Sequence, residues 1–132
     1  MCIRDSLNYQ APGVDILTRP DAKMETSANS FGLKVASEIF ADRNYLDNGN
    51  LISRKESNAV ITDPVEAREH VLFMVKNQAL RCLSGKQIPC NIDSICIHGD
   101  TLRSLEIAKI VKNNLSDNGF ELKPLNKMKK FL

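Results

Sequence analysis

Two short stretches of the sequence combine apolar residues with side chains that can exchange protons or bind anions. The first is EIFADR, residues 38–43, and the second is ICIHGD, residues 95–100. In both, an apolar run typical of a buried strand is followed by charged or titratable side chains. Because reactive groups in parallel α/β proteins gather where strands end at their carboxyl side, both stretches are candidate site segments.

In the first stretch, Glu38, Phe40 and Asp42 share one strand face, because side chains alternate along a strand with a period of two. A carboxylate in a strand otherwise suited to burial must be paired or ionise with difficulty, and either state suits general acid–base catalysis. Arg54, in the following loop, has the fork geometry to orient a carboxylate. The alternative is structural: Glu38 or Asp42 forms an ion pair with Arg43 or Arg54 that only holds a loop.

In the second stretch, His98 is the side chain whose charge changes near neutral pH, and Gly99 lets a backbone amide approach a ligand closely. The alternative is a tight turn in which Asp100 or Thr101 caps the helix that follows. A helix N-terminus also favours anions, so a phosphate or carboxylate ligand would be equally well served there. The motif alone leaves both interpretations open.

The elements that must position these residues alternate between strands and helices. The clearest is a helix that begins after Asp63 as N-cap, with Pro64 at N1 and Glu66 at N3, and runs to about Asn77. Around it the pattern predicts a strand at 13–17, a helix at 18–30, a strand at 33–41, a loop or small hairpin at 44–54, a weak strand at 79–83, a strand at 94–97, a helix at 102–115 and a short strand at 120–122. This order predicts α/β architecture with a largely parallel sheet.

Each of the two longer predicted helices has a one-sided apolar face. In the first helix we assign this face to Val65, Leu72 and Val75, and we interpret His70 as a surface or half-buried residue without a role. In the second helix the face is formed by Leu102, Leu105, Ala108, Ile110, Val111 and Leu115.

Composition disfavours two classes of partner. The net charge of +2 over 132 residues is too small to indicate nucleic acid, and no window of about 18 apolar residues could span a membrane. The four cysteines show no C-x-x-C pair and no His at metal-ligand spacing, so we interpret them as reduced thiols of a cytoplasmic protein and assign no metal ligands. The basic cluster within 127–130 is interpreted as a solvated end.

Taken in order, these motifs resemble those of a known family. EIFADRNY at 38–45, followed by GNLISR at 49–54, resembles the E-x-F-A-D-R-x-Y…G-x-L-x-x-R signature of the LamB/YcsF family, also called lactam utilisation proteins. The strand at 59–61, the helix start at Asp63-Pro64 and ICIHGD at 95–100 follow in the same order as in that family. The similarity covers residues 32–120.

The resemblance implies a (β/α) barrel related to the barrels of glycoside hydrolases and deacetylases. It also implies the activity of the A component of the prokaryotic ATP-dependent 5-oxoprolinase, in which 5-oxoproline is opened to L-glutamate with ATP and the partner subunits B and C. The residues on family motif positions are Glu38, Asp42, Arg43, Arg54, His98 and Asp100. We assign base chemistry to Asp42 or His98, anion binding to the two arginines, and orientation to Glu38 and Asp100, with a divalent metal left unassigned.

Other signatures of that family do not occur in this sequence, namely its Asp-Leu-Asn start and its A-C-G-F-H-A-G-D-like and H-x-K-P-H-G segments. A complete barrel takes about 250 residues. We therefore expect residues 7–125 to form the carboxyl-terminal half of such a barrel, inactive by itself, with a foreign leader at 1–6 and a basic tail at 126–132. Two alternative functions stay open, a metal-dependent amide hydrolase or deacetylase of the same lineage and a non-catalytic ligand-binding module.

Overall fold

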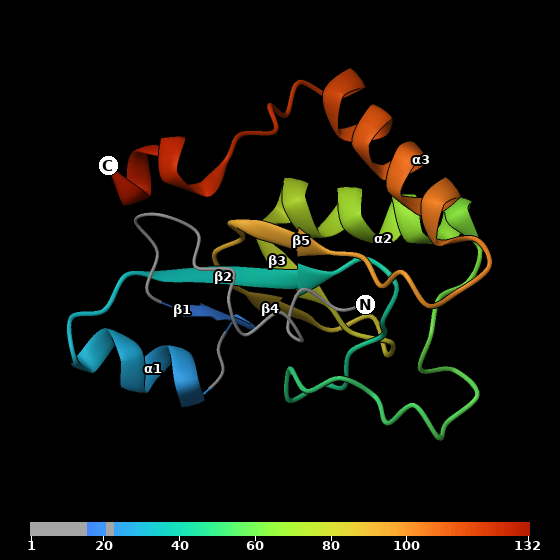
Figure 1. Ribbon diagram of the computed structural model, residues 1–132. Helices are drawn as coiled ribbons and strands as arrows, with labels where there is room; N and C mark the ends of the chain where they lie inside the picture. The colour runs from blue at the N-terminus through green and yellow to red at the C-terminus, as the bar shows by residue number, and fades with distance from the viewer. Residues whose placement is uncertain (1–15, 21–22) are drawn as a thin grey trace.

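The computed structural model describes residues 16–20 and 23–132, which form a mixed α/β fold (Figure 1). Three strands, β1 (Ile16–Thr18), β2 (Val35–Phe40) and β5 (Ser94–Cys96), pair in parallel in the order β1-β2-β5. Two helices, α2 (Pro64–Asn77) and α3 (Ser104–Asp117), pack on each other along one side of this sheet. The predicted α/β class with a parallel sheet is confirmed.

Strand β2 is the centre of the sheet and is buried along its whole length. Its sequence, VASEIF, joins β-branched and aromatic residues to small ones, which suits a strand covered on both faces. It pairs with β1 through Val35 opposite Ile16, and with β5 through Phe40 opposite Cys96. The carboxyl ends of β2 and β5 therefore lie at the same edge of the sheet.

Helix α1 (Lys23–Ser30) packs beside β1 and β2 and ends before Gly32, whose φ of 72° is readily adopted by glycine. The predicted leader at residues 1–6, the beginning of the predicted strand at 13–17 and Asp21 of the predicted helix cap lie outside the described residues. After α2, the strands β3 (Ala79–Arg81) and β4 (Gln87–Pro89) form an antiparallel hairpin. We predicted only the first of these two strands.

Helix α2 begins as predicted. Asp63 lies at its N-cap and accepts a hydrogen bond from the backbone N–H of Glu66 (3.0 Å), and Pro64 is the first helical residue. Its predicted face was partly correct: Leu72 and Val75 pack against the core, but Val65 is 44% exposed. The fully buried residues of the helix are Pro64, Ala67, His70, Val71 and Met74. His70, interpreted from the sequence as a surface or half-buried residue, is only 3% exposed.

Helix α3 begins at Ser104, two residues later than predicted. Leu102 and Leu105 are exposed, and the buried side of the helix is formed by Ile107, Val111 and Leu115, which recur every four residues. These three side chains pack with Ala41, Ile61, Ala67 and Val71 into a core between the two helices and the sheet. The helix ends as predicted before Gly119, with φ of 83°, but the predicted strand at 120–122 does not form.

The carboxyl-terminal tail docks on the fold through Phe131, whereas the lysines of the basic cluster within 127–130 are exposed, as their interpretation as a solvated end predicted. Two short 3₁₀ helices (Leu125–Lys127 and Lys129–Phe131) bring Phe131 into a buried position. The ammonium group of Lys130 pairs with the carboxylate of Asp93, which also accepts the backbone N–H of Ser37. The tail is therefore tied to the strands at the end of the sheet opposite the candidate site segments.

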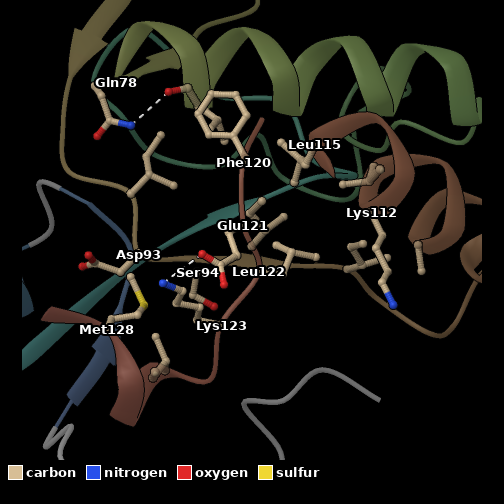
Figure 2. Close-up of a pocket in the computed structure, with 17 residues that line it drawn as sticks. Gln78, Asp93, Ser94, Lys112, Leu115, Phe120, Glu121, Leu122, Lys123 and Met128 are labelled. Atoms are coloured by element: carbon tan, nitrogen blue, oxygen red, sulfur yellow. Dashed lines mark hydrogen bonds and ion pairs between the residues drawn. The ribbon is translucent and has the colours of Figure 1, made fainter. Parts of the chain in front are cut away.

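Strand β5 is an edge strand of the described sheet, and its outer edge borders a cavity of about 400 Å³. The lining comes from β5, α2, α3 and the segment after α3, and Figure 2 shows Glu121, Leu122 and Lys123 passing Ser94 there. No helix in the described part is both long and apolar enough to cross a membrane. Within that part, Cys82, Cys90 and Cys96 form no disulfide.

The corrected face of α3 predicts different effects for two identical substitutions. Leu115→Ala removes a side chain that is 2% exposed and should lower the free energy of unfolding by roughly 2–5 kcal/mol. Leu105→Ala, on the same helix at 68% exposure, should change it by less than about 0.5 kcal/mol. Urea denaturation of both variants measures the difference, and equal losses would contradict this assignment of the buried face.

Candidate functional site

The parallel register of β2 and β5 brings Asp42 and His98 together at the carboxyl edge of the sheet. Phe40 lies opposite Cys96, so the residues two positions further along each chain meet on the same face. The backbone N–H of His98 donates to Asp42 Oδ2 (2.9 Å), and His98 Nδ1 lies 2.8 Å from Oδ1. Both residues are buried. The two candidate site segments, 38–43 and 95–100, therefore meet in the contact between Asp42 and His98.

The contact fixes the orientation of the His98 imidazole. A carboxylate only accepts hydrogen bonds, so Nδ1 carries the proton that bonds to Asp42. The ring also stacks on Phe40, with centroids 5.5 Å apart and an interplanar angle of 15°. Nε2 has no hydrogen-bond partner among the described residues and is the nitrogen that can accept a proton from a ligand. This is the geometry of a carboxylate-oriented general base.

Glu38 is buried on the same strand face but does not join this contact. It lies four residues before Asp42, about 13 Å away along an extended strand. Its Oε2 accepts a hydrogen bond from the hydroxyl of Ser94 (2.7 Å), the residue opposite it in β5. Glu38 therefore ties the two strands together further inside the sheet, and its expected orienting role stays a prediction.

Asp100 and Arg54 form an ion pair (3.2 Å) that links the loop after β2 to the loop after β5. Both side chains are about half exposed. The hydrogen bond from Arg54 lowers the pKa of Asp100 below its ordinary value. Neither Asp100 nor Thr101 caps α3 with its side chain, because the helix begins later and its N-cap position is occupied by Arg103. The capping interpretation was therefore wrong for both residues.

Arg43 is 7% exposed and follows Asp42 directly. One terminal nitrogen of its guanidinium donates to the backbone carbonyl of Ile52 (2.6 Å), whereas its buried Nε has no partner among the described residues. Burial lowers the pKa of Arg43, and the nearby positive charge of Arg54 lowers it further. An anion placed between the two guanidinium groups would relieve this repulsion.

Two residues that we did not predict as part of the site contact the backbone of residues 38–43. The Nε2 atom of His70, on α2, lies 3.0 Å from the backbone carbonyl oxygen of Arg43. The hydroxyl of Tyr45 accepts the backbone N–H of Phe40 (2.8 Å), and the Tyr45 and His70 rings stack with centroids 6.1 Å apart. The spacing of His70 from Ala67 and Met74 on the buried helix face was the signal that could have identified it.

The described part of the chain contains no group of three or more His, Cys, Asp or Glu residues placed to hold a metal ion. What it does contain is a base oriented by a carboxylate, two guanidinium groups close by and a loop-to-loop ion pair at the rim. Chemically, this set can remove a proton from a bound water or substrate while an anionic group is held next to it.

Comparisons with known proteins identify the family of the chain. The profile of the LamB/YcsF family matches residues 2–130. The chain is 39% identical over 117 residues to the protein named as the A component of 5-oxoprolinase in Clostridium beijerinckii, covering 89% of this chain and 46% of that protein. It is 45% identical over 100 residues to the protein of the same name from Staphylococcus haemolyticus, covering 76% of this chain and 40% of that protein.

A solved structure resembles the fold as well as the sequence. The lactam utilization protein from Thermus thermophilus superposes with a TM-score of 0.73 at 32% identity, covering 86% of this chain and 45% of that chain. The family resemblance of the sequence motifs is thereby confirmed. The chain spans less than half the length of each of these three proteins.

The buried His70 predicts a loss of stability in mild acid. Burial lowers its pKa from 6.5 to about 4, so the unfolded chain binds a proton first as the pH falls. The free energy of unfolding should be undiminished above about pH 6.5 and fall by roughly 3 kcal/mol as the pH approaches 4. Urea denaturation between pH 7 and pH 4 measures this, with a His70→Gln variant as the control.

The control should lose much less stability over the same interval, because glutamine does not titrate. The carboxylates titrate in both proteins, so their contributions to the free energy of unfolding cancel in the difference. Parallel pH profiles of the wild-type chain and His70→Gln would contradict the neutral, buried state of His70.

Proposed function

The chain belongs to the LamB/YcsF family, and from this premise we propose that it is part of the A component of a 5-oxoprolinase. In this proposal the complete A component, with partner subunits B and C, opens the lactam of 5-oxoproline to L-glutamate. The observation that carries the proposal is the buried pair of Asp42 and His98, held at 2.8 Å in the two stretches that resemble the family signature.

In the proposed reaction His98 is the general base. Its Nε2 takes a proton from the attacking water, and Asp42 stabilises the imidazolium that results through the bond to Nδ1. ATP, when bound, supplies the phosphoryl group that makes the carbonyl carbon of an unstrained lactam open to attack. The burial of Asp42 and His98 strengthens their interaction, because water screens charges less inside the protein.

Arg43 and Arg54 are the residues proposed to bind the anionic group. The carboxylate of 5-oxoproline fits between them, because it would give the buried Nε of Arg43 an acceptor and reduce the repulsion between the guanidinium groups. A phosphate group satisfies the same donors, so the residues are also compatible with ATP. Asp100 keeps Arg54 at the rim and Glu38 ties β2 to β5, which are the orienting roles we propose for them.

We propose that the complete fold is a (β/α) barrel and that this chain supplies its carboxyl-terminal half. Supporting this, the sheet is parallel, its reactive edge is the carboxyl edge, and the related proteins are more than twice as long as the matched region. The cavity beside β5 (Figure 2) is where a further strand and helix would pack. We expect the chain alone to be inactive and the complete enzyme to be cytoplasmic.

The base assignment is tested in the full-length protein, reconstituted with its partner subunits, by measuring L-glutamate release from 5-oxoproline. His98→Gln and Asp42→Asn should each lower kcat by roughly 10²–10⁴-fold with little change in KM. The first removes the base, and the second removes the carboxylate that keeps the proton on Nδ1 and stabilises the imidazolium. Arg54→Ala should instead raise KM, because it removes a substrate contact. Unchanged kcat in His98→Gln would contradict the assignment.

The same assay separates the other candidate functions. Turnover that needs no ATP and is abolished by a chelator would replace the proposal with a metal-dependent amide hydrolase. Binding of 5-oxoproline to the reconstituted protein without any turnover would replace it with a ligand-binding module.

A further inference from the structure

The carboxyl end of β2 is held at three backbone positions by residues outside the candidate base pair. The N–H of Phe40 donates to the Tyr45 hydroxyl, and the carbonyl of Asp42 accepts the N–H of Ile61 (2.9 Å). The next carbonyl, that of Arg43, lies 3.0 Å from Nε2 of His70. The two successive carbonyl groups of Asp42 and Arg43 are therefore both bonded, which restrains the backbone at the Asp42 side chain.

The chemistry of the His70 contact defines its tautomer. A carbonyl oxygen carries no proton, so the contact is a hydrogen bond only if Nε2 is protonated and donates. Burial lowers the pKa of His70 to about 4, so near neutral pH the ring carries a single proton. The stacking of Tyr45 on this ring adds packing on one side. The neutral Nε2–H form satisfies the Arg43 carbonyl.

We propose that His70 is a positioning residue for the proposed base, which it serves by holding the Arg43 carbonyl so that the Asp42 carboxylate stays aligned with His98. The inference rests on the proposed function of the Asp42–His98 pair. His70 touches neither reacting atoms nor substrate in this scheme. It acts through the backbone, from helix α2 to the end of strand β2.

A histidine that only filled space would behave differently. Leucine fills a similar buried volume without a polar atom, so a filling role would tolerate His70→Leu and leave the Asp42–His98 bond intact. A positioning role requires the donor, because His70→Leu leaves the buried carbonyl of Arg43 without that hydrogen bond and free to move. The difference is visible at His98, which His70 does not touch.

The imidazole nitrogens can be observed directly, because His70 and His98 are the only two histidines in the sequence. We would record ¹H–¹⁵N long-range correlation spectra of the full 132-residue chain at pH 7. His70 is expected to carry its proton on Nε2, and His98 on Nδ1. In His70→Leu the Nδ1–H of His98 should exchange with water on the order of tenfold faster, in line with the loss of one buried hydrogen bond.

Two further variants separate positioning from general loss of stability. His70→Gln keeps an N–H donor near the carbonyl and should largely restore slow exchange. Met74→Ala removes a fully buried side chain one turn along the same helix and should leave His98 exchange unchanged at pH 7. These signals report the Asp42–His98 bond and not turnover, so a failure of the positioning role can be distinguished from a failure of the proposed lactam reaction.

Three results would overturn the inference. One is a wild-type His70 whose Nε2 carries no proton, a result that does not depend on whether His70→Leu folds. Another is unchanged exchange at His98 in a folded His70→Leu protein. The third is an equal acceleration in Met74→Ala, which would make the effect one of stability alone.

Discussion

Parallel hydrogen bonding between β2 and β5, with Phe40 opposite Cys96, is the constraint on which the site depends. Side chains alternate along each strand, so this register places Asp42 and His98 on one face at the same edge. A slip of one residue would turn one of them to the helix side and separate the pair. The core beneath α2 and α3 stabilises the register, because Ala41 packs there while Asp42 faces the other way.

Burial of four titratable side chains at one strand end is tolerated only because their polar atoms have partners. Asp42 accepts from both the backbone and the ring of His98, His70 donates to the Arg43 carbonyl, and Arg43 donates to Ile52. The buried Nε of Arg43 is the atom in this group that lacks a partner within the described residues. That exception lies where an anionic ligand is proposed to bind, so the same network supports both the fold and the proposed chemistry.

Local signals predicted much of this arrangement. The start of α2 is encoded within four residues, by Asp63, Pro64 and Glu66. The run at 33–41 is apolar enough to indicate a buried strand. The convergence of Asp42 and His98 follows from topology, since parallel strands end at a common edge. The burial of His70 could not be predicted in this way, because it depends on how α2 packs against the end of β2.

Other errors have the same origin in tertiary packing. Leu102 and Leu105 fit an apolar stripe in the sequence, yet the helix begins later and turns them to the surface. Strand β4, Gln-Ile-Pro, has no strand pattern of its own and is defined by its pairing with β3.

The pairing of Asp42 with His98 is tested directly by a double-mutant cycle with Asp42→Ala, His98→Ala and the double variant, measured as free energies of unfolding. We expect a coupling energy of roughly 1–3 kcal/mol between the two side chains, and additive effects within about 0.5 kcal/mol would contradict the pairing.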